Sequence, residues 1–146
     1  MIVVSWNCRS LGTTFKINAA RDILVNEKPD IYMIQETKTS KQENQKLIQK
    51  LRNYEGTVLE ATEASGGICT IWDKRKWELI NQKISNHWIK TDLRDLNTKA
   101  LYGIMNVYSP NHYREKEHCW NSIKEELAER QKGKLILRRL KSDKEH

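Results

Sequence analysis

The sequence predicts an α/β fold, and three observations support this. Residues 2–36 have the pattern of a strand, a helix and a second strand. Residues 57–109 then form a series of short β-prone runs separated by turn residues, which is typical of antiparallel pairing. The length of 146 residues suits one domain that is large enough to bury a core. A single α/β domain therefore accounts for most of the chain.

The first unit joins two strands through one helix. Residues 2–7 are mostly β-branched or aromatic, which predicts a strand, and residues 15–27 carry apolar side chains at helical spacing. The next strand begins after Pro29 and stops at Glu36. The link is long enough for a parallel crossover. We therefore expect Asn7 and Glu36 side by side at the C-terminal ends of neighbouring strands, where open α/β sheets place their sites.

The rest of the chain supplies two more helices and the other strands. Ser40 and Glu43 have the spacing of a capping box, which predicts a helix over residues 41–52. Gly66-Gly67 marks a tight turn or a close approach of the backbone. A third helix is expected over residues 114–130. The β-prone runs are residues 57–61, 67–73, 77–84, 88–93 and 100–109, with a further strand beginning at 134–137.

Composition and charge limit the classes of function. The net charge is +7, and the six Lys or Arg against two acidic residues from residue 132 onward give that tail +4 of it. This favours a polyanionic partner, although the body is only mildly basic. Three separated cysteines without a CxxC motif suit a reducing compartment and no structural zinc. We find no signal peptide and expect no membrane partner, so we expect an intracellular protein of the nucleus or cytoplasm.

Glu36 and Asn7 are candidate ligands at the expected rim. A glutamate at the end of a buried strand is an oxygen ligand for a hard cation such as Mg²⁺, which one or two carboxylates plus water and phosphate usually hold. The alternative is an ordinary rim charge. The carboxamide of Asn7 can orient a metal-bound carboxylate or bond a phosphate oxygen, whereas the commoner use of asparagine is to cap a turn.

Four further residues lie at or beyond strand ends. Tyr108 can present a phenol that donates to a phosphate or stabilises developing negative charge, and its alternative is a half-buried strand tyrosine. Arg9 and Lys38 can contact a phosphate backbone, but each taken singly is better explained as a solvated charge. Asn111 is a candidate substrate contact or a helix N-cap.

Together these pieces resemble the endonuclease/exonuclease/phosphatase superfamily. Four motifs occur in the family order, at residues 5–11, 29–38, 66–68 and 106–111, and the Ile-Gln-Glu-Thr core at 34–37 is the most specific. The nearest likeness is to the apurinic-endonuclease-like domain of non-LTR retrotransposons. The resemblance extends to about Leu137 and covers only the N-terminal part of that domain.

The resemblance implies a partial four-layer α/β sandwich, in which mixed sheets are flanked by helices and the C-terminal part of the domain is missing. Residues 1–137 would be the truncated domain and residues 138–146 a basic tail. Enzymes of the family are Mg²⁺-dependent phosphodiesterases or phosphomonoesterases, with Mn²⁺ as the alternative metal. By this resemblance Glu36 is the metal ligand, Asn7 its neighbour in the metal and phosphate site, and Tyr108 the phenol that faces the scissile phosphate of DNA.

One departure from the family pattern decides the expected activity. The strand at residues 134–137 should continue into a Gly-Asp-Phe-Asn type motif, but here it continues into Arg138-Arg139-Leu140-Lys141. The later Ser-Asp-His motif is absent too, and Ser142-Asp143 followed by His146 does not replace it. The groups that activate the attacking water are therefore missing, and loss of one member of a cooperating site removes several powers of ten in rate.

We therefore expect an inactive remnant of a retrotransposon endonuclease. A second hypothesis is an active Mg²⁺-dependent endonuclease completed by another chain. A third, of a different class, is a non-catalytic nucleic-acid-binding module that uses the basic tail. We also expect poor stability and self-association, through an exposed sheet face or an unpaired edge near residues 100–109.

Overall fold

The structure is a computed structural model that describes residues 1–62, 66–110, 112–129 and 134–138. The elements run in the order β1 (Val3–Asn7), α1 (Thr14–Glu27), β2 (Ile31–Gln35), α2 (Lys41–Gln49), β3 (Tyr54–Leu59), β4 (Ile68–Asp73), β5 (Trp77–Ile84), β6 (Trp88–Asp95), β7 (Leu101–Val107), α3 (Tyr113–Glu129) and β8 (Lys134–Arg138).

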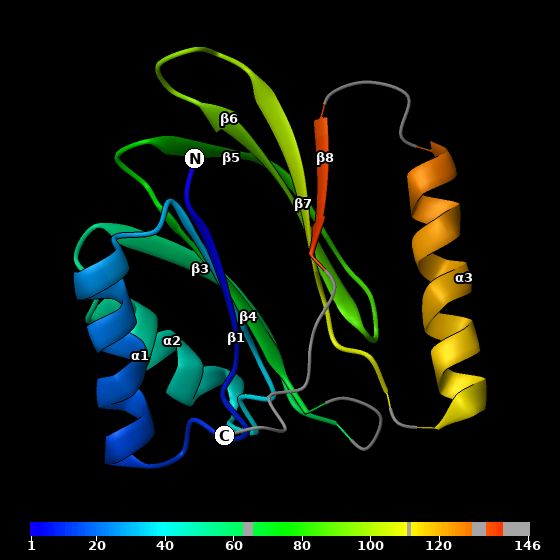
Figure 1. Cartoon of the computed structure of the whole chain (residues 1–146), viewed down its shortest axis with the longest axis horizontal. Coiled ribbons are helices and arrows are strands. Elements are labelled where there is room, and N and C mark those ends of the chain that lie inside the picture. Colours follow the sequence, from blue (N-terminus) through cyan, green and yellow to red (C-terminus); the bar gives the residue numbers. More distant parts are fainter. Residues whose placement is uncertain (63–65, 111, 130–133, 139–146) are drawn as a thin grey trace.

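The strands form two sheets of mixed direction. The first has the order β1-β2-β4-β3 and the second the order β5-β6-β7-β8. The pairs β1–β2 and β7–β8 are parallel, and the other pairs are antiparallel. Helices α1 and α2 lie outside the first sheet and α3 lies outside the second (Figure 1). The result is the expected α/β architecture of two sheets between helices.

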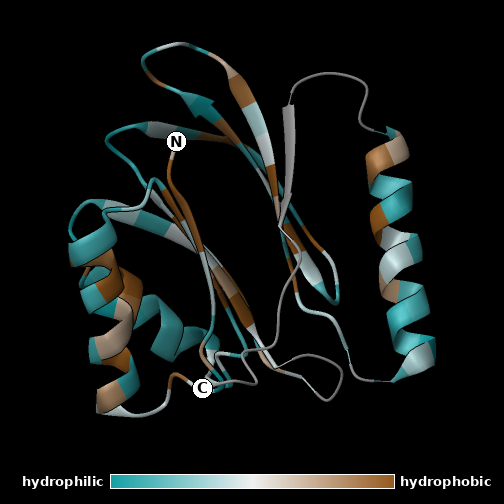
Figure 2. Cartoon of the chain, viewed as in Figure 1, coloured by the Kyte–Doolittle hydropathy of each residue, from teal (hydrophilic) through white to brown (hydrophobic). Residues whose placement is uncertain are grey.

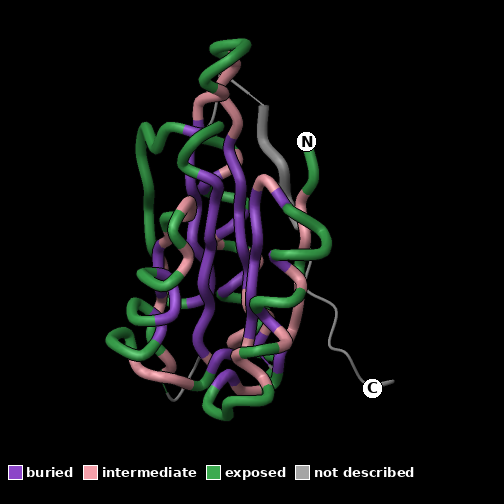
Figure 3. Tube along the Cα trace, turned by 90° about the vertical axis from the view of Figure 1, so that its left-hand side faces the viewer, coloured by how far each residue is buried: buried purple, intermediate pink, exposed green. Residues whose placement is uncertain are grey.

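The helices and sheets form four layers: α1 with α2, the first sheet, the second sheet, and α3. Three clusters of apolar side chains, each called an apolar layer below, lie between them. Strand β2 is buried at all five residues because each of its faces meets one of these layers. Figure 2 shows hydrophobic residues along the central strands, and Figure 3 shows the same strands buried between exposed segments. The layer between the sheets contains Ile31, Met33, Trp72, Trp77, Leu93 and Ile104. The layer under α1 and α2 includes Tyr32, Ile34, Leu47 and Ile71, and the layer under α3 includes Trp88, Met105, Cys119 and Ile123.

The helices begin and end where local chemistry stabilises them. The Thr13 hydroxyl accepts a hydrogen bond from the Lys16 amide at the start of α1, and Lys28 ends that helix in the left-handed conformation. The predicted capping box of Ser40 and Glu43 is present at the start of α2. Ile123 of α3 is buried against the second sheet, and Trp120 and Leu127 are partly buried and pack against the same cluster.

Two predictions about the strands were wrong. Helix α2 ends at Gln49 and β3 already begins at Tyr54, whereas the sequence pattern placed the helix end at residue 52 and the strand start at residue 57. The stretch near residues 100–109 is not an unpaired edge, because β7 pairs with β6 on one side and with β8 on the other. The parallel pairing of β8 covers that edge. Of the predicted basic tail, Arg138 closes β8 and residues 139–146 lie outside the described residues.

The structure also describes the three cysteines and the apolar length of the helices. Cys8, Cys69 and Cys119 are all buried and free of disulfide bonds. Burial raises the pKa of Cys69 to about 12 and that of Cys119 to about 11, so both thiols are poor nucleophiles. Within the described ranges, no helix is long and apolar enough to cross a membrane.

Candidate functional site

The candidate site lies at the rim where β1 and β2 end. These strands pair in parallel, and Asn7 lies opposite Gln35, so Asn7 and Glu36 emerge from the same edge as expected. Strand β7 ends at this edge too, in the other sheet, and Tyr108 follows its last residue (Figure 1). The three predicted residues therefore come from the ends of three strands and both sheets.

The backbone at this rim is strained. Arg9, Ser10, Glu36 and Lys38 have φ values of 56°, 121°, 54° and 51°, and the positive-φ region is sparsely used by residues other than glycine. Such conformations persist only where the surroundings hold them, and they cluster at functional sites. Glu36 therefore leaves β2 in a fixed turn.

Backbone hydrogen bonds hold the two rim segments against each other. The Cys8 amide donates to the Gln35 carbonyl at 3.0 Å, and the Leu11 amide donates to the Thr37 carbonyl at 2.8 Å. The Lys38 amide donates to the Gly66 carbonyl at 2.7 Å. The segments after β1 and β2 and the segment before β4 thus share one hydrogen-bonded frame.

The predicted close approach at Gly66-Gly67 is present and lies inside the site. A Cβ atom on Gly66 would lie 3.3 Å from Cγ of Glu36 and 3.5 Å from Cε1 of Tyr108. Gly67 has φ +89°, and a Cβ there would lie 2.6 Å from the Thr37 hydroxyl. The Glu36 and Tyr108 side chains thus both lie next to Gly66, where a larger residue would crowd them.

Tyr108 is half-buried and its phenol stays protonated. Its amide donates to the carbonyl of buried His87 at 2.7 Å, which joins the end of β7 to the start of β6. Burial raises the pKa of Tyr108, and the charges of Glu36 and Glu115 raise it further. A neutral phenol beside a carboxylate can donate a hydrogen bond to an anionic oxygen.

The other candidate residues divide into three groups. The carboxamide oxygen of Asn7 accepts the Arg9 amide at 3.3 Å, so the turn-capping use of Asn7 is present, and its second lone pair stays available. Arg9 and Lys38 are exposed at the same rim. Asn111 lies outside the described residues.

The donor set at the rim is small. Among the described residues, no group of three or more His, Cys, Asp or Glu side chains is placed to hold a metal ion. Glu36 offers one half-buried carboxylate and Asn7 one carboxamide oxygen. Such a set fits a cation that keeps most of its water and takes its other ligands from phosphate, as Mg²⁺ does, and it does not fit a closed all-protein cage.

Sequence reasoning missed two buried amides beside the site. Gln35 and Asn106 are 1% and 0% exposed, and their side chains meet between the sheets, with Nε2 of Gln35 donating to Oδ1 of Asn106 at 3.0 Å. The available signal was an amide in each of two otherwise apolar strands, since buried polar groups require partners.

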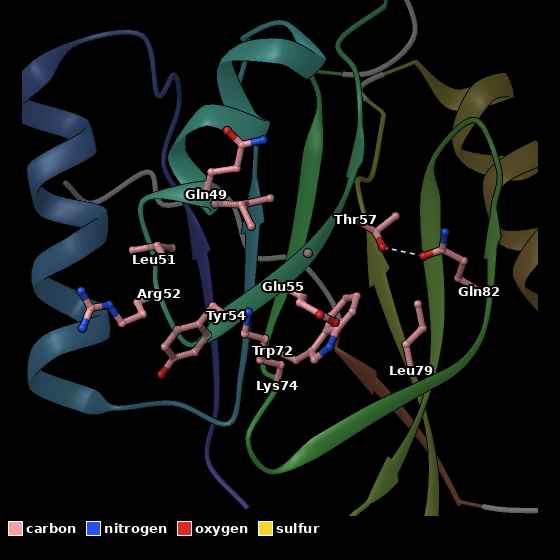
Figure 4. A pocket seen from close by; sticks show the side chains of 12 residues that line it. Gln49, Leu51, Arg52, Tyr54, Glu55, Thr57, Trp72, Lys74, Leu79 and Gln82 are labelled. Carbon is pink, nitrogen blue, oxygen red and sulfur yellow. Dashed lines mark hydrogen bonds between the residues drawn. The ribbon is translucent and has the colours of Figure 1, made fainter.

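One described hollow lies away from the rim. A cavity of about 510 Å³ opens between α2, β3 and β5, and Trp72 and Leu79 are among its lining residues (Figure 4). There the Thr57 hydroxyl donates to Oε1 of Gln82 at 2.5 Å and joins the edge strands of the two sheets. Asn7, Glu36 and Tyr108 are not among the lining residues, so this hollow is separate from the rim site.

Comparison with known proteins gives one family. The sequence model described as Endonuclease/Exonuclease/phosphatase family matches residues 4–139. Among curated proteins, none matches this chain.

Several solved structures share the fold at low identity. D. rerio TDP2 complexed with single strand DNA product has a TM-score of 0.71 and 12% identity, over 94% of this chain and 58% of that one. The human Nocturnin catalytic domain has a TM-score of 0.66 and 15% identity, over 92% and 61%. The mannosyl-6-phosphatase Bt3783 of Bacteroides thetaiotaomicron has a TM-score of 0.71 and 10% identity, over 94% and 63%. The chain thus spans about three fifths of the length of these structures.

Proposed function

The chain belongs to the endonuclease/exonuclease/phosphatase family, and we propose that its rim is the metal- and phosphate-binding part of a phosphodiesterase site. One observation carries this proposal: Glu36 and Tyr108, from different sheets, both contact the position of a Gly66 Cβ, at 3.3 Å and 3.5 Å. A glutamate and a tyrosine side chain that meet beside one glycine bring a carboxylate and a neutral phenol into one neighbourhood, which suits the binding of a cation and the phosphate that accompanies it.

Each side chain has a distinct role in this proposal. Glu36 and Asn7 are the residues that would hold Mg²⁺, or Mn²⁺ in its place. The bound cation would supply charge neutralisation at the phosphate. Tyr108 donates its phenolic hydrogen to a phosphate oxygen and stabilises charge that develops there, and its raised pKa keeps that hydrogen in place at neutral pH.

The same proposal limits the activity of these 146 residues. The Gly-Asp-x-Asn and Ser-Asp-His motifs of the resemblance are not in this sequence. Hydrolysis needs an activated water in addition to charge stabilisation. We therefore propose that the chain has little or no nuclease activity unless a further segment or another chain supplies the water-activating groups.

Nucleic acid is the proposed substrate class. D. rerio TDP2, of similar fold, was solved with single strand DNA product, and the human Nocturnin domain was solved with a bound sulfate anion. Arg9 and Lys38 are exposed beside Glu36, where they can contact a phosphate backbone, and Asn111 is retained as a third contact. The derivation from a non-LTR retrotransposon endonuclease rests on the order of the four sequence motifs.

A plasmid-nicking assay tests this function. Supercoiled DNA is incubated with the chain, with and without Mg²⁺, and Glu36→Ala is run in parallel. We expect no nicking above the Glu36→Ala control. Mg²⁺-dependent nicking that disappears in Glu36→Ala would show that the water-activating groups are present after all. Mg²⁺-dependent nicking that persists in that variant would contradict the assignment of the site to Glu36.

The charge distribution supports a second candidate function. The tail from residue 132 carries +4 of the net charge of +7, and residues 138–146, with four Lys or Arg against two acidic residues, carry +2 of that. These last residues are proposed as a basic segment that binds nucleic acid without catalysis. Such binding should fall steeply with salt and survive Glu36→Ala. Binding that is insensitive to salt and lost in Glu36→Ala would reject the tail and favour the rim.

A further inference from the structure

We infer that Gln35 and Asn106 are positioning residues that hold Asn7, Glu36 and Tyr108 in one constellation by means of a buried amide bridge between the two sheets. This inference rests on the proposed function, since it assigns the bridge to the rim site. Neither side chain faces the open rim, so each acts through its neighbours in the chain.

The bridge is a connected set of hydrogen bonds. Nε2 of Gln35 donates to the Ser5 hydroxyl and to Oδ1 of Asn106, at 3.0 Å each. Nδ2 of Asn106 in turn donates to the Cys69 carbonyl at 3.0 Å and to the Thr70 hydroxyl at 3.1 Å. The set therefore ties β1, β2 and β4 of one sheet to β7 of the other.

Each site residue is connected closely to this bridge, either by one or two residues of chain or by one backbone hydrogen bond. Glu36 directly follows Gln35, and Tyr108 lies two residues after Asn106. The Gln35 carbonyl accepts the Cys8 amide at 3.0 Å, which places the preceding residue, Asn7. Gln35 thus determines the positions of Asn7 and Glu36, and Asn106 determines the position of Tyr108 relative to both.

The chemistry of the bridge favours this role over simple packing. The core of the layer between the sheets is a cluster of apolar side chains, so two amides beside it carry a desolvation penalty that apolar side chains would avoid. Their hydrogen bonds recover that penalty in only one relative position of the sheets, because amide bonds are directional and apolar contacts are not. The bridge therefore restricts the distance between Glu36 and Tyr108 to a smaller range than apolar contacts between the sheets would.

The test measures Mn²⁺ binding by the full chain together with the Mn²⁺-induced broadening of the Tyr108 ring signal in tyrosine-labelled protein. Tyr108→Phe assigns that signal. The wild-type chain should bind Mn²⁺ and show the broadening, and Glu36→Gln should lose both. Gln35→Leu and Asn106→Leu should each weaken Mn²⁺ binding by about tenfold or more, the usual effect of removing a group that orients a metal ligand.

A matched pair of threonines separates positioning from stability. Thr70 accepts a bond from Asn106, whereas the Thr91 hydroxyl has no hydrogen-bond partner among the described residues, and both side chains are buried. Thr70→Val should weaken Mn²⁺ binding about threefold, by the loss of one net hydrogen bond, and Thr91→Val should not change it. If Gln35→Leu and Asn106→Leu do not fold, the comparison of Thr70→Val with Thr91→Val still tests the positioning role of the bridge.

The outcomes distinguish the two proposals. If Glu36→Gln abolishes binding while Gln35→Leu, Asn106→Leu and Thr70→Val retain wild-type affinity and broadening, the positioning role is wrong and the site stands. If Glu36→Gln binds Mn²⁺ as the wild-type chain does, or if the wild-type chain binds none, the proposed site is wrong and the positioning role falls with it.

Discussion

The ammonium group of Lys90 lies 2.7 Å from Oε1 of Glu126, and both side chains are nine-tenths or more buried. The pair joins β6 to α3, the helix that covers the second sheet. Lys83 of β5 reaches the other oxygen of the same carboxylate, also at 2.7 Å. One carboxylate therefore fastens α3 to two strands of the second sheet.

Breaking this pair from one side should destabilise the chain strongly. Glu126→Ala leaves the Lys90 ammonium buried without a counter-charge, so we expect the free energy of unfolding to fall by about 3–5 kcal/mol. Urea denaturation followed by tryptophan fluorescence measures this. The exposed neighbour Glu125→Ala is the control and should change little, and a similar loss in both variants would contradict the role of the buried pair.

The same carboxylate should make stability depend on acid pH. Burial alone would raise the pKa of Glu126, but the hydrogen bonds from Lys83 and Lys90 outweigh it and hold that pKa below its ordinary value. The stabilisation is therefore complete above the ordinary glutamate pKa and is lost as the pH falls through the lower folded value. Denaturation from about pH 6 to about pH 3 should show a steeper loss in the wild-type chain than in Glu126→Gln. Parallel curves would reject this.

Gly67 should tolerate no side chain, in contrast to Gly12. Gly67→Ala must adopt φ +89° and also displace the Thr37 hydroxyl, so it should lower the free energy of unfolding by about 1–3 kcal/mol. A Cβ on Gly12 would meet its nearest neighbour at 3.6 Å, an ordinary contact, and Gly12→Ala should be nearly neutral. Thermal unfolding of both variants measures the difference. Equal melting temperatures would show that the turn at Gly67 relaxes without cost.

The free edge of β1 should promote self-association. In the described part of the chain β1 pairs only with β2, and Ile2 beside it is 51% exposed. Ile2→Lys places a charge at this edge and should shift the chain toward monomer in sedimentation velocity. Phe15→Lys, at a 77% exposed position on α1, is the matched control and should not. A wild-type chain that is monomeric at high concentration would contradict the prediction.

Local chemistry made most of the elements predictable. The capping box at Ser40 and Glu43 predicted the start of α2, and the β-prone run between turn residues predicted β5 at its observed bounds, Trp77–Ile84. The start of β3 was missed because Glu55 and Gly56 interrupt the β-prone pattern. A Cβ on Gly56 would lie 2.8 Å from Cδ1 of Ile48, so the glycine is there to let α2 pack closely, which a single sequence does not reveal.

The position of the candidate site was predictable from the sequence, but the buried hydrogen bonds that hold its residues in place were not. Parallel pairing of β1 and β2 follows from the length of their connection, and it places Asn7 beside Glu36. The contact of Gln35 with Asn106 joins residues 71 positions apart in different sheets. No local pattern specifies which two buried amides meet, because that depends on how the sheets pack.

The rim is held by main-chain groups, and this has a consequence for how such a site diversifies. The Cys8, Leu11, Thr37 and Lys38 amides all bond to backbone carbonyls, so a side chain that makes none of the rim's hydrogen bonds contributes little to its shape. The exposed side chains of Arg9 and Lys38 can therefore be exchanged for residues that tolerate their positive φ without moving the neighbouring backbone. New substrate preferences can arise on this frame by single substitutions, while the fold beneath it is inherited unchanged.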